Sequence, residues 1–323
     1  MDNTQQTHVV VGAGAVGGGV AQRLAAHGHR VKIVTRSGSG PAMAGIERIA
    51  ADAGDRRGLT EIASGAHAIY NCANPAYDRW AADWPPLAAS MLDAAEATGA
   101  RLVIMSNLYG AAAGSSPMRA TDPLDPPSKK GAIRAQMWNE ALAAHEAGRI
   151  RATEARASDF FGPGLGQSGH FGDRAAPRLI AGKPMSFIGK RNVVHSWSYV
   201  GDTCATLAAL GTDDRSLGRA WHVPTLAPMT AQAMANAISH AAGHGDAKVK
   251  QIPTSALRLV GMFSKLVREL PEMVYQFTAP FVIDADDTAA TFGLAATPLD
   301  QQVEATIASY RVASSGMQTA ASV

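Results

Sequence analysis

The first residues that could do chemistry are the six of Gly12-Ala13-Gly14-Ala15-Val16-Gly17. They follow a short apolar run, His8–Val11, and precede an amphipathic stretch, Val20–Ala26, an order typical of a buried strand, a turn and a helix. In a G-x-G-x-x-G turn the first glycine permits the tight bend, the second lets the backbone approach a pyrophosphate, and the third lets the helix pack on the strand. The N-terminus of the helix then presents N–H donors to the anion. The pattern predicts dinucleotide binding by Gly12, Gly14, Ala15, Val16 and Gly17.

A second strand, Val31–Thr35, leads directly into Arg36 and Ser37. About 20 residues after such a glycine turn, an NAD-selective fold usually carries an Asp or Glu that bonds the ribose 2′-hydroxyl. That acid is missing here, whereas the guanidinium of Arg36 can pair with a 2′-phosphate and Ser37 adds a hydroxyl. We therefore expect NADP(H) as the cofactor, NAD(H) being disfavoured, with Arg36 and Ser37 in its site.

The elements that position these residues alternate between strand and helix through the first half of the chain. Further strands are predicted at Ile46–Ala51, Ala66–Asn71, Arg101–Ser106 and Ile150–Ala155, and helices at Gly58–Ser64, Leu87–Thr98 and Ala132–Ala147. Such alternation is typical of an α/β fold with a Rossmann-type, doubly wound parallel sheet.

After Arg156 this rhythm breaks at a turn-rich, glycine-rich segment. Later patterns predict helices at Asp202–Leu210, Thr230–Ala242 and Thr254–Leu270, and a strand at Ala220–Val223. We expect a dinucleotide-binding domain over residues 1–159, with 193–223 returning to it, a smaller C-terminal substrate-binding cap over 160–192 and 224–312, and a flexible Ser/Ala-rich tail over 313–323.

Four further segments carry a resemblance to a known family. They are Asp52 after the third strand, Asn71-Cys72-Ala73-Asn74, Phe160-Phe161-Gly162-Pro163-Gly164, and Trp197-Ser198-Tyr199-Val200-Gly201-Asp202. Together with the glycine turn, and in this order, they make the chain resemble the extended short-chain dehydrogenase/reductase family, in its NAD-dependent epimerase/dehydratase group, over nearly all of residues 8–311. The resemblance implies that Asp52 touches the adenine amino group and that Ala73 and Asn74 lie beside the cofactor.

The resemblance breaks at the residues that carry the family's chemistry. Family members have Tyr-x-x-x-Lys on a helix, where the lysine lowers the pKa of the phenol from about 10 so that it exchanges a proton with a carbonyl. In the matching stretch, Ser128 to Arg134, Lys130 occupies the tyrosine position and Arg134 the lysine position. The usual proton donor is therefore absent.

Three explanations compete. In the first, Tyr109 replaces the donor, and Ser106 nearby polarises the substrate carbonyl. In the second, Lys130 is the acid, because the like charge of Arg134 one helical turn away disfavours the ammonium form. In the third, the fold binds NADP(H) without proton transfer, as a sensor does.

The C-terminal part favours an apolar substrate. Five residues are of the types that line an apolar pocket: Met262, Phe263, Met273, Tyr275 and Phe277. We expect an NADP(H)-dependent oxidoreductase that acts by hydride transfer on a small, rather apolar carbonyl or enone. The alternatives are a non-catalytic NADP(H)-binding sensor and a nucleotide-sugar epimerase or dehydratase.

Composition excludes several other classes. With 29 Lys+Arg against 27 Asp+Glu and no block of like charge, the chain lacks the footprint of a nucleic-acid-binding protein. No apolar run approaches about 18 residues and no leader is evident, so we expect a cytoplasmic protein with a small-molecule substrate and no membrane partner. No metal-ligand spacing is present. Family members commonly pair through two long helices, and Leu87–Thr98 and Ala132–Ala147 are the candidates for such a homodimer interface.

Overall fold

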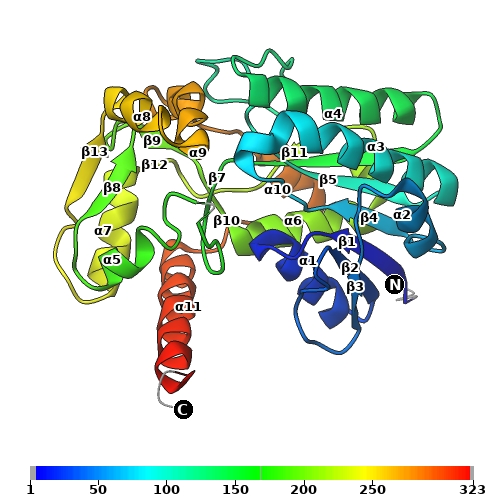
Figure 1. Cartoon of the computed structure of the whole chain (residues 1–323), viewed down its shortest axis with the longest axis horizontal. Helices are drawn as coiled ribbons and strands as arrows, with labels where there is room; N and C mark the ends of the chain where they lie inside the picture. The colour runs from blue at the N-terminus through cyan, green and yellow to red at the C-terminus, as the bar shows by residue number, and fades with distance from the viewer. Residues whose placement is uncertain (1–4, 168, 321–323) are drawn as a thin grey trace.

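A seven-stranded parallel sheet forms the centre of the protein, in a computed structural model that describes residues 5–167 and 169–320, with side chains up to residue 312 (Figure 1). In their order across the sheet, the strands are β11 (Ala220–His222), β6 (Arg151–Ala157), β5 (Arg101–Asn107), β4 (Ala68–Asn71), β1 (Thr7–Val11), β2 (Arg30–Thr35) and β3 (Ile46–Ala50). The strand order reverses between β1 and β4, which is the topological switch point where open α/β sheets bind ligands. The predicted doubly wound Rossmann-type sheet is confirmed.

Helices cover both faces of the sheet, because alternate residues of each strand point to opposite sides. Val10 packs against α1 (Ala15–Ala26) and α6 (Val200–Thr212), whereas Val9 and Val11 pack into the core under the helices of the other face. Those helices are α2 (Arg56–Ile62), α3 (Trp80–Thr98) and α4 (Lys129–Glu146). Figure 1 shows α3 and α4 above the sheet and α1 and α6 below it.

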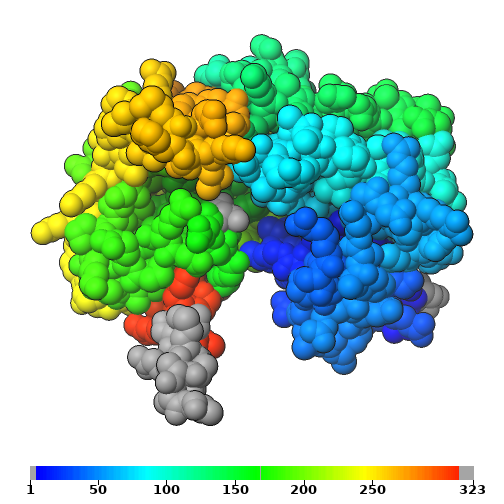
Figure 2. Space-filling view, viewed as in Figure 1, coloured from blue at the N-terminus to red at the C-terminus, as the bar shows by residue number. Residues whose placement is uncertain are grey.

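The rest of the chain builds a second body with its own apolar core, which includes Phe161, Phe187 and Met234. Its strands pair as β7 (Asp159–Phe161) with β10 (Trp197–Tyr199), β8 (Met185–Ile188) with β13 (Val249–Ile252), and β9 (Val194–His195) with β12 (Met229–Thr230). Its helices are α5 (Ala176–Ile180), α7 (Ala231–Ala241), α8 (Thr254–Gly261), α9 (Lys265–Arg268), α10 (Asp286–Phe292) and α11 (Leu299–Ala320), and the short 3-10 helices of the chain are η1 (Tyr77–Arg79), η2 (Asp214–Ser216) and η3 (Pro271–Phe277). Figure 2 shows a hollow between this body and the first strands of the sheet.

One helix of the second body lies elsewhere. The Phe292 ring of α10 packs edge-on against Trp221 of β11, at 4.8 Å between ring centroids, so α10 lies on the edge of the central sheet. The chain thus returns to the sheet a second time within the segment 224–312, which was expected to belong to the cap.

Two predicted helices differ from the observed ones by more than a few residues. The helix expected from Leu87 begins at Trp80, because Trp80 and Trp84 are buried and extend its inner face past Pro85-Pro86, which lie on the exposed side. The helix expected over Thr254–Leu270 is interrupted, because α8 ends at Gly261 and α9 begins only at Lys265. A Cβ on Gly261 would lie 2.9 Å from the Cα of Arg268, so the glycine lets the second helix fold back onto the first.

The end of the chain also differs from the expectation. Helix α11 continues to Ala320, through most of the segment that was predicted to be a flexible tail from residue 313. Residues 321–323, the end of that tail, lie outside the described part of the chain.

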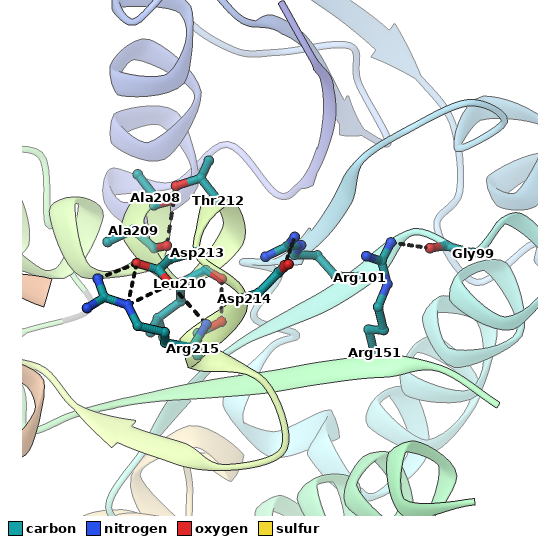
Figure 3. A network of polar contacts seen from close by, with 11 residues as sticks. Gly99, Arg101, Arg151, Ala208, Ala209, Leu210, Thr212, Asp213, Asp214 and Arg215 are labelled. Atoms are coloured by element: carbon teal, nitrogen blue, oxygen red, sulfur yellow. Dashed lines mark hydrogen bonds and ion pairs between the residues drawn. The ribbon is translucent and has the colours of Figure 1, made fainter. Parts of the chain in front are cut away.

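A polar network ties the amino end of β5 to the segment after α6 (Figure 3). The buried guanidinium of Arg101 donates to Asp214 of η2 at 2.7 Å, and Arg151 on the neighbouring strand donates to the Gly99 carbonyl at 2.7 Å. Arg215 pairs with Asp213 in the same turn. These contacts hold the edge of the sheet that is opposite the carboxyl ends of the strands.

Candidate active site

The glycine turn at the carboxyl end of β1 has the geometry that its pattern predicts. Gly12 adopts a φ of +102°, and a Cβ there would lie 2.6 Å from the Cys72 carbonyl oxygen. A Cβ on Gly17 would lie 2.1 Å from the Gly12 carbonyl oxygen. The first and third glycines are therefore needed by the packing itself, whereas a Cβ on Gly14 would meet nothing within 4 Å and so points into open space.

The N-terminus of α1 is free to receive an anion. Its N-cap, Gly14, supplies no side-chain acceptor, and the first turn carries no acidic residue. The orphan N–H groups of that turn, which include those of Ala15 and Val16, thus meet the open space beside Gly14. The turn fits a pyrophosphate, because both the space and the donors are present.

The other predicted cofactor residues lie at the same edge of the sheet, because the parallel register places the ends of β2, β3 and β4 beside Val11 of β1 or one strand further. Arg36 and Ser37 are exposed directly after β2, and the Ser37 hydroxyl donates to Ser39 at 3.0 Å. The Arg36 guanidinium makes no hydrogen bond to a described residue, so it is available to a ligand. Asp52, after β3, accepts from the Gly54 N–H at 2.9 Å, and Ala73 and Asn74 follow β4.

Tyr109 lies two residues beyond the carboxyl end of β5. Its N–H donates to the Asn107 side chain at 3.1 Å, and its ring stacks on Trp80 with 6.0 Å between centroids. Burial raises the pKa of Tyr109 to about 12, although hydrogen bonds with Tyr77 and Gln276 act to lower it. The phenol is therefore protonated throughout the neutral range.

Ser106 is buried at the end of β5 and faces a small cavity of about 20 Å³. Residues from α4, β6 and β11 line the same cavity, among them Arg134, Arg156 and His222. No hydrogen bond joins the Ser106 hydroxyl to Tyr109 among the described contacts, so the pairing of these two residues is not seen in this structure.

Lys130 begins the inner face of α4, whose N-cap Ser128 accepts from the Gly131 N–H at 3.0 Å. Its ammonium contacts the carboxylates of Glu269 and, at 2.8 Å, Glu272, and lies 4.5 Å from the centre of the Tyr77 ring. These partners come from the segment that follows α9. Lys130 thus joins the second body to α4, across the space that Tyr109 borders.

The Arg134 side chain points away from Lys130. Its guanidinium lies 4.2 Å from the centre of the Trp84 ring and 5.0 Å from that of Trp80, and it donates to the Met105 carbonyl at 3.3 Å. Burial lowers its pKa to about 10. The like-charge contact expected between Arg134 and Lys130 is not present, because the Lys130 ammonium lies against two carboxylates instead.

The sequence interpretation missed Asp159, which lies at the start of β7 and hydrogen-bonds to His195 of β9. The two side chains are 2.9 Å apart, and the Ser158 hydroxyl lies 3.3 Å from the same His195 nitrogen. Burial by itself raises the pKa of Asp159, but the hydrogen bond and charge of His195 bring it below its usual value. The sequence signal for Asp159 was an acidic residue just after a predicted strand and directly before Phe160-Phe161-Gly162.

Three tyrosines near the carboxyl end of β5 lie close enough to two carboxylates to feel their charge: Tyr77, Tyr109 and Tyr275, with Asp159 and Glu272. Asp159 raises the pKa of Tyr109, Tyr77 and Tyr275 electrostatically, in addition to burial, and Glu272 does the same for Tyr77 and Tyr275. The Tyr275 hydroxyl is buried and has no partner in the described structure. The site therefore combines phenol donors with two carboxylates that each have a basic partner, Lys130 for Glu272 and His195 for Asp159.

The predicted pocket walls divide into two groups. Met273 and Phe277 are buried, and Tyr275 is half-buried near Tyr109 and Asp159. Met262 and Phe263 do not line a pocket, because the turn between α8 and α9 carries them outward into solvent.

Comparison with known proteins decides the family. Residues 8–223 match the model of the NAD dependent epimerase/dehydratase family, which is more than half of the chain. The chain belongs to this family. A search of curated protein sequences gave no match.

Solved structures share the fold of this family member over nearly its whole length. An epimerase from Methanothermobacter thermautotrophicus superposes with a TM-score of 0.80 and 17% identity, covering 98% of this chain and 95% of the other. UDP-glucose 4-epimerase from Thermotoga maritima gives 0.77 and 16%, covering 95% and 99%. UDP-glucose 4-epimerase from Thermus thermophilus, in complex with NAD, gives 0.76 and 18%, covering 94% and 99%. At such identities the likeness establishes the extended short-chain dehydrogenase/reductase fold, and the family supports an NAD(P)-dependent enzyme.

Two searches of the described residues gave no candidates. None of their helices has both the length and the apolarity needed to cross a bilayer. No group of three or more His, Cys, Asp or Glu side chains among them is arranged to hold a metal ion.

Proposed function

We propose that this family member is an NADP(H)-dependent oxidoreductase that reduces a small, rather apolar carbonyl or enone, with Tyr109 as the proton donor. The observation that carries the proposal is the Tyr109 phenol, partly buried and protonated just beyond the carboxyl end of β5, near two cations, Lys130 and Arg134, that are both engaged by other groups. Bound NADP(H) would supply the hydride.

The charge of the site supports an uncharged substrate. Nucleotide sugars, on which two of the similar structures act by name, carry a pyrophosphate. Lys130 is already paired with carboxylates and Arg134 is held against tryptophans and a backbone carbonyl, so neither cation is free to bind that group. An anionic substrate would thus enter without a counter-charge, which is costly in a buried site.

The pKa of Tyr109 is compatible with a donor role. With a pKa of about 12 the phenol carries its proton at neutral pH and is rarely present as the phenolate. Ser106, which faces a separate small cavity that Tyr109 does not line, has no role in this proposal, and Lys130 is assigned to holding the cap through Glu269 and Glu272.

The cofactor assignment rests on three features. Gly14 leaves open space at the start of α1, Arg36 offers an unbonded guanidinium, and Ser37 a hydroxyl. A 2′-phosphate would accept charge-assisted hydrogen bonds from this pair. Asp52, Ala73 and Asn74 complete the proposed cofactor site at the ends of β3 and β4.

The experiment is NADPH consumption by the purified protein with a panel of apolar ketones and enones. Tyr109→Phe is expected to lower kcat by about 100-fold or more, the usual contribution of a proton donor. Tyr310→Phe, whose phenol bonds to Asp173 in the second body, serves as the control and should retain activity. Because the donor has a pKa of about 12, the rate should stay level between about pH 7 and pH 9.

Two other outcomes would overturn the proposal. Tight NADPH binding without turnover of any compound in the panel would favour the sensor. Interconversion of UDP-sugars with no net cofactor consumption would favour a nucleotide-sugar epimerase.

A further inference from the structure

The turn between α8 and α9 exposes a group of large apolar side chains. Phe263 is 88% exposed and Met262 66%, and three neighbours on the two helices are also exposed: Leu259, Val260 and Leu266. We call these five residues the α8–α9 tip. Elsewhere in the described chain, large apolar side chains are exposed only singly, at Met43, Val194 and Val312. A contiguous exposed apolar patch is typical of an interaction surface.

Basic residues surround this tip, and acidic ones are absent from it. Arg258, Lys265 and Arg268 are exposed, and none of them forms an ion pair with a described carboxylate. Residues 253–268 contain no Asp or Glu. The two acids that follow, Glu269 and Glu272, are both taken up by Lys130 on the inner side. The side chains exposed on residues 253–268 are therefore apolar, cationic or neutral polar, and the exposed carboxylate on a neighbouring element is that of Asp78 in η1, which contacts α9.

The convex shape of the tip favours a lipid surface over a protein partner. An exposed fraction of 88% means that almost no protein atom covers the Phe263 ring, so the ring stands out on a convex turn. A protein surface would need a matching pocket to cover it, whereas a lipid interface admits apolar side chains to a shallow depth while basic side chains meet anionic headgroups. Figure 2 shows this segment as an outer lobe of the molecule, coloured gold to orange.

We propose that the α8–α9 tip docks the protein peripherally on an anionic lipid surface, with Phe263 and Met262 inserted and Arg258, Lys265 and Arg268 at the headgroups. This departs from the expectation of no membrane partner, which rested on overall charge and on the lack of a spanning segment. Peripheral docking needs neither, because it depends on the local arrangement of charge and apolar surface.

The test is co-flotation of the full-length protein with vesicles of phosphatidylcholine alone or with one quarter phosphatidylglycerol. The protein should float with the anionic vesicles only, and high salt should release it. Phe263→Ser is expected to lower the partition coefficient by about tenfold. The triple change Arg258→Gln, Lys265→Gln, Arg268→Gln should lower it by about 100-fold, at about fivefold for each charge.

Matched controls separate the tip from general surface effects. Met43→Ser removes an exposed apolar side chain elsewhere, and Arg30→Gln, Arg48→Gln, Lys183→Gln removes three exposed charges elsewhere. Both controls should bind as the unaltered protein does. All altered side chains are exposed, so the variants should keep the thermal unfolding midpoint.

Three results would overturn the proposal. The first is no flotation with either vesicle. The second is flotation that the tip variants do not weaken, which would assign binding to another face. The third is a concentration-dependent dimer in sedimentation velocity that Phe263→Ser abolishes, without flotation, which would make the tip a contact between copies of this chain.

Discussion

Acid should destabilise this protein through His8, which is fully buried in β1. Its ring lies 4.8 Å from that of His29 and 5.6 Å from that of His67, and its Nε2 has no partner in the described structure. Burial, followed by the charges of His29, His67 and Arg101, lowers its pKa from 6.5 to about 3. The folded protein therefore keeps this ring neutral while the unfolded chain protonates it.

The magnitude follows from the two pKa values. Between pH 6.5 and about pH 3 the unfolded chain binds more protons, so the free energy of unfolding falls as the pH falls through this window. At pH 5 the unfolded state gains RT ln(1 + 10^1.5), which is about 2 kcal/mol, while the folded state gains almost nothing. His222, also buried and with a pKa lowered to about 4, adds about 2 kcal/mol at the same pH. For a domain with about 5–15 kcal/mol of stability, this loss is large.

The assay is urea unfolding, followed by tryptophan fluorescence, at pH 7.5 and pH 5.0. We expect the unaltered protein to lose about 2 kcal/mol more between these pH values than His8→Leu does, because leucine cannot protonate in the unfolded chain. Val10→Ala, on the same strand, should lower stability at both pH values without changing the difference. Equal losses for the unaltered protein and His8→Leu would refute the reasoning, since His8 would then titrate alike in both states.

Three further predictions concern the site. Gly17→Ala should lower the free energy of unfolding by about 1–3 kcal/mol in urea titrations, because its Cβ would lie 2.1 Å from a backbone oxygen. Gly14→Ala should leave stability unchanged. It should weaken NADPH binding by about tenfold or more in calorimetry, because its Cβ would fill the space proposed for the pyrophosphate. Arg36→Asp should weaken NADPH binding by about 10- to 100-fold relative to NADH, and an unchanged preference in thermal-shift titrations would contradict the assignment. Lys130→Met should raise KM while leaving kcat within about threefold, because it releases Glu272 without removing the donor; a collapse of kcat would instead make Lys130 the acid.

The fold of the first half of the chain was predictable because its signals are local. The turn from Gly12 to Gly17 is continuous in sequence; contacts with nearby backbone require the glycines at positions 12 and 17, and Gly14 borders open space. The alternation of strands and helices was likewise sufficient for the parallel sheet. The bounds of α3 were not, because the burial of Trp80 and Trp84 around Arg134 overrides the local signal of Pro85-Pro86.

The catalytic side was predictable only in part. Tyr109 was identified from its position after a strand, but its high pKa depends on burial among side chains from distant segments. Asp159 and His195 are 36 residues apart and Lys130 and Glu272 are 142 apart, so neither pair leaves a spacing that a reader of the sequence can recognise.

By itself, then, the sequence determined the Rossmann-type sheet and the glycine turn, because these depend on residues close together in the chain; the NADP(H) preference read from the end of β2 stays a prediction. Only the tertiary structure decided the partners of Lys130 and Arg134, the carboxylates near Tyr109, and the outward turn of Met262 and Phe263. Those features depend on how α4 meets the segment after α9 and on where Gly261 reverses the chain. Charge, burial and exposure are properties of that packing, and residue order alone does not carry them.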